Sequence, residues 1–214
     1  MATRMDRHAA LGERLIDAAE RIIAAEGLAA LKARDIAHEA GCAIGMIYKL
    51  FAHMDELVLC VGVRTLAMLD VALTKARSRE GGESGEEAVA ELVRLAGAYL
   101  EFAARHTIRW RALFEHRTTH GHALPEWFIE RQHLLFAQLE QPLSALLPEF
   151  TPSARRVFAR TLFSAVHGIV ALGLEEKLVT LPLPNLSDQL AVTVRAIARG
   201  RAELNSVARL PEQY

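Results

Sequence analysis

Apolar residues recur at intervals of three and four positions along almost the whole chain of 214 residues. That spacing matches the turn of an α-helix, and no segment shows the strict period of two that a half-buried strand requires. The sequence also contains no Asn-Gly or Asp-Gly pair of the kind that closes a tight β-hairpin. The pattern therefore predicts an all-α fold of about nine helices.

Residues that start or stop helices punctuate this pattern. Gly27 and Gly41 are placed to end helices, Ser84 with Glu87 forms a capping box, and Thr151 precedes a proline. Helices are predicted over residues 7–26, 33–40, 44–50, 54–77, 85–105, 107–118, from 124 to a kink or end at Pro142, 152–179, and 186–207. Residues 181–185 are predicted to be a linker. The apolar stripe of the last helix is predicted to be Leu186, Leu190, Val194 and Ile197.

Composition sets the broad class of the protein. Charged residues make up 24% of the chain and the formal net charge is −1, so bulk charge favours no particular partner. Cys42 and Cys60 have neither disulfide nor metal spacing. The N-terminus lacks the apolar region of a secretory signal, and the uncharged stretch 161–174 is too short to span a bilayer. We therefore expect a cytoplasmic protein with no membrane partner.

Residues 33–51 form two short predicted helices joined by a turn at Gly41. Glycine lets the chain reverse without a Cβ clash, as a helix-turn-helix requires. The residues expected to face a shared core are Ile36, Ala37, Ile47, Leu50 and Phe51. The outer face would then carry Ala43, Ile44, Met46 and Lys49. A helix presented in this way can enter the major groove of DNA, although the spacing alone also fits an ordinary αα-hairpin.

The N-terminal region resembles the TetR family of repressors over about 50 residues, with the family's motifs in the same order. The matching residues are Arg14 to Ala19, Glu26, Gly27, Asp35 to Ala37, Ala40, Gly41, Gly45, Ile47, Tyr48, Phe51, Glu56 and Leu57. The later part resembles the C-terminal domain of one TetR subgroup at Ala98, Tyr99, Phe102, Ala103, Trp110 and Val166 to Gly168, with Phe163 where tryptophan is usual. The resemblance implies a DNA-binding domain over 1–53 and a ligand-binding and dimerisation domain over 54–214.

The same resemblance assigns roles in DNA binding. Tyr48 and Lys49 would contact phosphates, and Gly45 would let the helix approach the DNA backbone closely. The side chains of Ala43, Ile44 and Met46 would meet bases and contact thymine methyl groups in the major groove. The full set of predicted DNA-binding residues is Lys32, Ala43, Ile44, Gly45, Met46, Tyr48, Lys49 and His53.

Three departures from the family pattern bear on this prediction. The family usually has Ser or Thr where this chain has Lys32 and Ala43, and Lys where it has Met54. Residues 1–60 also hold seven Lys and Arg against nine Asp and Glu, a formal charge of −2. These features predict fewer phosphate contacts. They leave open an alternative, a helical small-molecule-binding dimer whose DNA-binding head is weak or vestigial.

Aromatic residues gather on the middle helices of the sequence. Each could be core filler, and as a group they fit an apolar ligand pocket with a few polar groups. The resemblance implies such a pocket between the fourth helix and the fifth to eighth. The predicted ligand-binding residues are Tyr99, Phe102, Trp110, Phe114, Trp127, Phe128, His133, Phe136 and His167. We therefore expect a repressor that leaves its operator when a small apolar or aromatic effector binds.

The chain shows no signature of an enzyme, a cofactor or a metal site. It has no nucleophile elbow, glycine-rich phosphate loop, paired catalytic carboxylates or metal-ligand spacing. Residues 161–174 instead combine apolar character with small residues, which permits close helix packing. The resemblance implies a homodimer formed through the last two helices. Its two recognition helices should lie about one DNA turn apart, roughly 34–36 Å.

Overall fold

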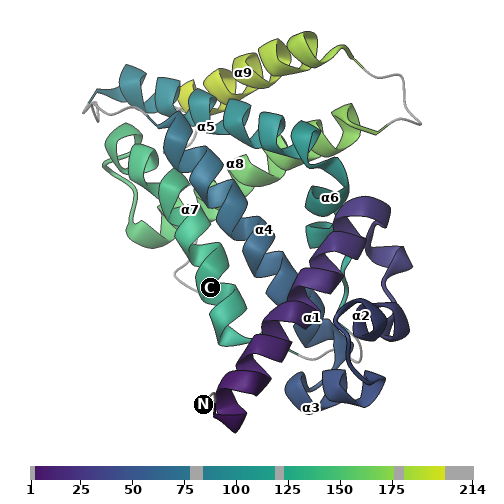
Figure 1. The fold of residues 1–214 in the computed structure, drawn as a ribbon. Coiled ribbons are helices and arrows are strands. Elements are labelled where there is room, and N and C mark those ends of the chain that lie inside the picture. The colour runs from purple at the N-terminus through teal and green to yellow at the C-terminus, as the bar shows by residue number, and fades with distance from the viewer. Residues whose placement is uncertain (1–2, 78–83, 119–122, 176–180, 201–214) are drawn as a thin grey trace. The chain divides into compact units, whose positions relative to one another are not determined.

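The computed structural model describes residues 3–77, 84–118, 123–175 and 181–200. Within these ranges it contains nine α-helices, two 3₁₀ helices and no strand (Figure 1). The helices, in chain order, are α1 (Arg4–Glu26), η1 (Leu28–Ala30), α2 (Ala33–Glu39), η2 (Ile44–Met46), α3 (Ile47–Leu50), α4 (Met54–Ala76), α5 (Gly85–Arg105), α6 (Thr107–Glu115), α7 (Glu126–Leu146), α8 (Pro152–Gly173) and α9 (Leu183–Arg199). The predicted all-α fold is confirmed.

The chain divides into two compact units, which we call the head unit and the body unit. The head unit comprises residues 1–68 and 105–131, and the body unit comprises residues 69–104 and 132–214. Helices α4 and α7 contribute residues to both. The head unit therefore contains the predicted helix-turn-helix together with α6, a helix distant from it in sequence.

The core of the head unit forms where α1 contacts α2, α3 and α6. Leu15 of α1, Ile36 of α2 and Ile47 of α3 are each 0% exposed. Burial of one such side chain stabilises the fold by about 1.5–3 kcal/mol. The predicted inward orientation of Ile36, Ala37, Ile47 and Phe51 is confirmed, while Leu50 is only partly buried.

Several predicted helix ends are confirmed. Gly27 (φ 86°) follows α1 and Gly41 (φ 66°) lies in the turn after α2, both in the left-handed region that favours glycine. Ser84 and Glu87 form the predicted capping box at the start of α5. The hydroxyl of Thr151 accepts the Ala154 N–H at 3.2 Å, and a proline occupies the first turn of α8.

Other boundaries were predicted wrongly. Helix α1 begins at Arg4, earlier than the predicted residue 7, because Thr3 and Asp6 form a capping box there. Helix α6 ends at Glu115, before the predicted residue 118. Pro142 lies inside α7 and does not end it, because the helix continues to Leu146.

The last two helices differ most from the prediction. Helix α8 ends at Gly173, short of residue 179, and residues 176–180 lie outside the described residues. Helix α9 already begins at Leu183, within the predicted linker, because proline is tolerated in the first turn of a helix. It ends at Arg199, and predicted residues 201–207 lie outside the described residues. Its buried stripe includes Ala198 in place of Ile197.

Apolar packing and a few polar contacts stabilise the body unit. Helices α8 and α9 contact one another, and a Cβ added at Gly173 would lie 2.5 Å from the side chain of Leu186. Arg199 of α9 pairs with Glu86 of α5 at 2.6 Å. A larger residue at position 173 would therefore displace the side chain of Leu186.

Helix α4 is the one helix among the described residues that is long and apolar enough to cross a membrane by length and composition. It nevertheless carries Arg64, which pairs with carboxylates of α1, and it buries Leu57 and Val61 in the core of the head unit. This packing buries part of the apolar surface of α4.

Candidate nucleic-acid interface

The turn after α2 leads directly into residues 43–49, which we call the reading segment. The first three helical residues, Ile44–Met46, form a 3₁₀ turn, and α3 follows from Ile47. Ile47 is fully buried, whereas Ile44 is 45% and Tyr48 is 55% exposed. The exposed residues of the segment are Ala43, Ile44, Gly45, Tyr48 and Lys49. Ile47 thus anchors the reading segment in the core, while Ala43, Ile44, Gly45, Tyr48 and Lys49 face solvent.

Met46 does not lie on the outer face as predicted. Its side chain is only partly exposed and packs against the core of the head unit. The 3₁₀ turn explains the difference, because its tighter winding rotates successive side chains by about 120°, compared with about 100° in an α-helix. Ala43 and Ile44 therefore supply the apolar part of the exposed surface.

Lys32 and Ala43 occupy the residue before α2 and η2, respectively. Neither helix has a side-chain cap, because lysine and alanine offer no acceptor for the first free N–H groups. The ammonium of Lys32 makes no ion pair or hydrogen bond with the described residues. It lies directly before α2, in a hollow that Glu26, Asp35 and Glu39 also line.

His53 has a structural contact that the sequence analysis did not anticipate. Its Nδ1 accepts the backbone N–H of Glu56 at 3.2 Å, and the Glu56 carboxylate accepts the N–H of Ala52 at 2.7 Å. These reciprocal bonds cap the start of α4 next to Met54. Because Nδ1 accepts a hydrogen bond, the neutral ring of His53 carries its proton on Nε2.

Carboxylates of α1 are engaged within the head unit. Arg64 of α4 pairs with Glu13, Asp17 and Glu20, each at 2.6 Å, and Arg109 of α6 pairs with Glu20 as well. Partial burial by itself lowers the pKa of Arg64, but the three carboxylates outweigh this effect and raise it. We call these five residues the Arg64 network. The sequence did not indicate this network, because its members are far apart along the chain.

A second polar contact fixes α1 against the helix-turn-helix. The Nε–H of Arg14 donates to the carbonyl oxygen of Ala40 at 3.3 Å, and Ala40 is the residue directly before Gly41. Arg21 pairs with Glu39 at the end of α2 at 2.5 Å. These contacts, with the shared core, hold the turn against α1.

Part of the predicted ligand-binding set comes together in the body unit. The hydroxyl of Tyr99 and Nδ1 of His167 are 2.7 Å apart, and burial lowers the pKa of His167. Phe163 lies 5.5 Å from the rings of both Tyr99 and Phe136 and stacks on His167. We call Tyr99, Phe136, Phe163 and His167 the aromatic cluster. Phe163, absent from the predicted set, contacts the other three members.

The remaining candidates are placed differently. Trp110 and Phe128 are buried in the head unit, and Phe102 is buried in the body unit. Phe114 is 46% and Trp127 is 39% exposed. The side chain of His133 is also exposed. The structure therefore groups Tyr99, Phe136 and His167, and it leaves Phe114, Trp127 and His133 outside this group and partly exposed.

No group of three or more His, Cys, Asp or Glu side chains in the described residues could hold a metal ion.

Burial, with smaller effects from Glu56 and Glu13, raises the pKa of Cys60 to about 11, so its thiol stays protonated at neutral pH.

Comparisons with protein families agree with this geometry. Residues 15–61 match the model of bacterial regulatory proteins of the tetR family, and residues 92–197 match a tetracyclin repressor-like C-terminal domain. No protein with a curated description matches the sequence.

Solved structures show the same fold. A protein of unknown function from Rhodococcus sp. RHA1 is 23% identical, with 90% of this chain and 95% of that chain covered and a TM-score of 0.67. A tetR-family transcriptional regulator from Streptomyces coelicolor is 20% identical, with 100% and 93% covered and a TM-score of 0.66. A TetR transcriptional regulator from Rhodococcus sp. RHA1 is 18% identical, with 89% and 97% covered and a TM-score of 0.60.

The two family models together cover both the helix-turn-helix and most of the helical body. The reading segment lies inside the first match, and the aromatic cluster lies inside the second. The chain belongs to the TetR family and is a DNA-binding transcriptional regulator, not an enzyme.

Proposed function

We propose that this regulator is a cytoplasmic repressor that leaves its operator when a small apolar or aromatic molecule binds the body. Residues 1–53 would bind DNA, and residues 54–214 would bind the effector and form the dimer. The observation that carries the effector proposal is the hydrogen bond between Tyr99 and His167 within the aromatic cluster. A polar pair among aromatic rings is the combination that typically orients a small ligand in an apolar site.

DNA recognition is proposed to use the exposed residues of the reading segment. Ile44 and Ala43 would contact thymine methyl groups, while Tyr48, Lys49 and Lys32 would contact phosphates. His53 would contact phosphate near the start of α4, where its Nδ1 accepts the Glu56 N–H. Met46, which is partly buried, would contribute less than Ile44.

A gel shift with the DNA upstream of the protein's own gene tests this proposal. We expect binding that weakens steeply with salt, since phosphate contacts release counterions. Lys49→Ala should weaken binding to every fragment, whereas Ile44→Ala should reduce discrimination between sequences. If no upstream fragment binds at low salt, the head is vestigial and the protein is a small-molecule-binding dimer instead.

Effector response can be tested with a panel of phenols and aromatic alcohols. Compounds that raise the melting temperature of the protein should lower its operator affinity by about 5–150-fold, the usual range of allosteric coupling. Tyr99→Phe should weaken this response without changing operator affinity in the absence of compound. Compounds that bind while operator affinity stays constant would contradict the effector proposal.

Dimerisation is proposed to use α8 and α9. Large apolar side chains on these helices are exposed in the single chain, with Leu172 at 63%, Val192 at 57% and Leu183 at 45%. A second copy would cover them, and a two-fold axis would present both reading segments to one DNA site. Light scattering should show a dimer, and Val192→Glu should convert it to a monomer. Exposed Arg105, at the end of α5, provides the neutral control as Arg105→Ala.

A further inference from the structure

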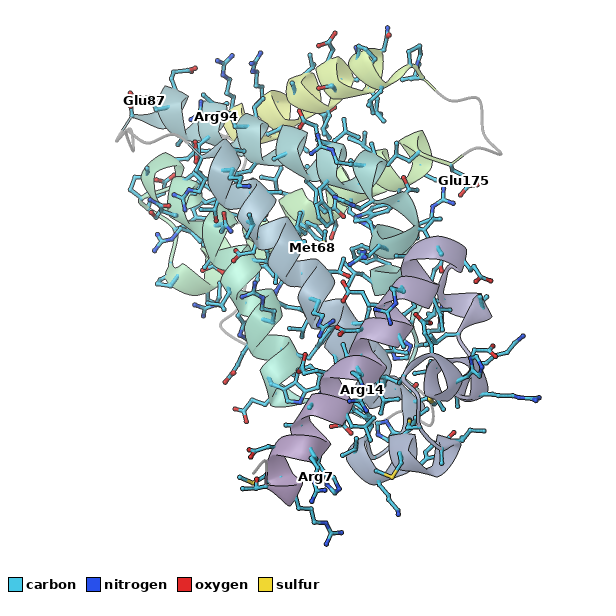
Figure 2. The ribbon with its side chains drawn as sticks, in the orientation of Figure 1. Arg7, Arg14, Met68, Glu87, Arg94 and Glu175 are labelled. Atoms are coloured by element: carbon cyan, nitrogen blue, oxygen red, sulfur yellow. The ribbon has the colours of Figure 1, made fainter. Side chains whose placement is uncertain are left out.

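A groove of about 540 Å³ runs along the first three turns of α1. Its lining residues are Arg4, Arg7, His8, Ala10, Leu11 and Arg14. Their spacing of three and four positions places them on one face of the helix. Three of the six are arginines and none is acidic, so the groove carries positive charge. Figure 2 shows two of these arginines, Arg7 and Arg14, on α1.

The cations of the groove are largely unpaired. The side chains of Arg4, Arg7 and His8 make no ion pair or hydrogen bond with any of the described residues. The nearby acids are engaged elsewhere, since Asp6 accepts the backbone N–H of Thr3 and Glu13 pairs with Arg64. No carboxylate in the described residues therefore neutralises the groove from within.

The groove continues toward the reading segment. Leu11, at its floor, is buried in the core that α2 and α3 share. Arg14, at its far end, donates to the carbonyl oxygen of Ala40, next to the turn that leads into residues 43–49. The N-terminal end of α1 and α3 also lie at the same end of the head unit (Figure 1).

We propose that this groove binds phosphates of the operator backbone just outside the base pairs met by the reading segment. The proposal rests on the proposed mode of DNA binding. From Arg4 to Arg14 the helix extends about 15 Å. That length is enough to reach more than one phosphate of one strand. Arginine suits this role because its guanidinium binds phosphate oxygens in a bidentate manner.

The test compares an Arg4→Ala/Arg7→Ala variant with wild type on two DNA fragments. One is the segment of upstream DNA that wild type protects in a footprint, and the other lacks its outermost base pairs. Arg105→Ala is the matched control, because it removes one exposed, unpaired arginine from the last turn of α5. Arg4→Lys/Arg7→Lys keeps the charge and should retain most of the affinity. Melting temperatures of all variants should match wild type, since Arg4 and Arg7 are exposed.

On the longer fragment the double alanine variant should bind at least about tenfold more weakly at low salt. The slope of log affinity against log salt should become shallower by about 1 for each phosphate that the variant no longer neutralises. On the shortened fragment wild type and variant should bind almost equally. Equal affinities on both fragments would overturn the groove proposal alone. Equal reductions on both would overturn its location outside the recognised bases. Absence of any wild-type binding would overturn both this proposal and the proposed DNA contacts.

Discussion

Two sides of the head unit differ in how completely their polar groups are paired. The inner side is where α1 packs against α4 and α6, and the outer side carries the reading segment and Lys32. On the inner side, Arg64 pairs with three carboxylates, and Leu15, Ile36 and Ile47 are fully buried. On the outer side, Lys32 and Lys49 have no partner among the described residues. The Arg64 network is fully paired in the free protein, although Nε2 of His116 makes no hydrogen bond with the described residues. The outer side lacks the contacts that a bound polyanion would supply.

This contrast changes how the charge of the head should be interpreted. A formal charge of −2 over residues 1–60 suggests a surface that repels DNA. The structure directs Glu13, Asp17 and Glu20 toward α4 and α6, while Arg4 and Arg7 remain exposed. The arrangement of charge on the surface, not its sum, determines the local potential that DNA meets.

The largest loss of stability is expected when the Arg64 network on the inner side is disrupted. Arg64→Ala leaves three carboxylates without their shared cation, and we expect the free energy of unfolding to fall by about 2–3 kcal/mol. Urea unfolding followed by circular dichroism measures this change. Arg105→Ala should stay within about 0.5 kcal/mol of wild type. Equal stability of the two variants would show that the Arg64 network contributes nothing.

Gly41→Ala tests the turn that joins the two sides. A side chain at φ 66° costs about 1 kcal/mol, and a Cβ there would meet nothing within 4 Å, so the cost is purely conformational. Urea unfolding should show this loss together with weaker DNA binding, because the turn positions the reading segment. An unchanged stability would mean that the turn relaxes to another conformation without cost.

Lys32→Ser should supply the missing N-cap of α2 and stabilise the fold, while weakening DNA binding. Serine would create a Ser-x-x-Asp pattern with Asp35, the spacing that forms the capping box at Thr3 and Asp6. We expect a gain of about 0.5–1 kcal/mol in unfolding free energy. The salt slope of DNA binding should become shallower if Lys32 contacts phosphate. A loss of stability would contradict the missing-cap interpretation.

Stability on the inner side should depend on pH through His116. Burial lowers the pKa of His116 below its ordinary value of 6.5, although Asp55, 3.7 Å away, opposes this shift. The folded state therefore binds fewer protons than the unfolded state, and stability falls as pH drops through 6.5 toward the folded pKa. His116→Gln should lose this part of the difference in unfolding free energy between pH 7.5 and 5.5. Identical pH profiles for both proteins would rule out His116 as its source.

The smallest effect on folding is expected for Gly45→Ala. The added Cβ would meet nothing within 4 Å, and φ at Gly45 is not positive, so stability should change by less than about 0.5 kcal/mol. Operator affinity should nevertheless fall by about 1 kcal/mol, or roughly fivefold, if DNA approaches this backbone closely. Unchanged affinity would place the DNA backbone away from Gly45.

Helix ends and core positions were predicted correctly where they depend on a few neighbouring residues. Gly27, Gly41 and the Ser84 and Thr151 caps mark helix ends because each satisfies free backbone groups or a special φ within a few residues. The burial of Ile36 and Ile47 followed from helical periodicity in the same way.

Features that depend on three-dimensional arrangement were missed. Arg64 meets carboxylates 44 to 51 positions earlier, a relation set by how α4 crosses α1 and not by spacing. Met46 was misplaced because the choice between a 3₁₀ and an α turn depends on packing around Ile47. Phe163 joins the aromatic cluster through contacts with α5 and α7, which no pattern within α8 could indicate.

The division of the reading segment between buried Ile47 and exposed neighbours has a consequence for the history of such genes. In the proposed mode of DNA binding, substitutions at Ala43, Ile44 or Lys49 would change the surface that meets DNA and leave the core untouched. A duplicated copy of the gene would then acquire a new operator through single substitutions without passing through an unfolded intermediate. Burial of Leu15, Ile36 and Ile47 stabilises the fold, so it would tolerate such surface substitutions.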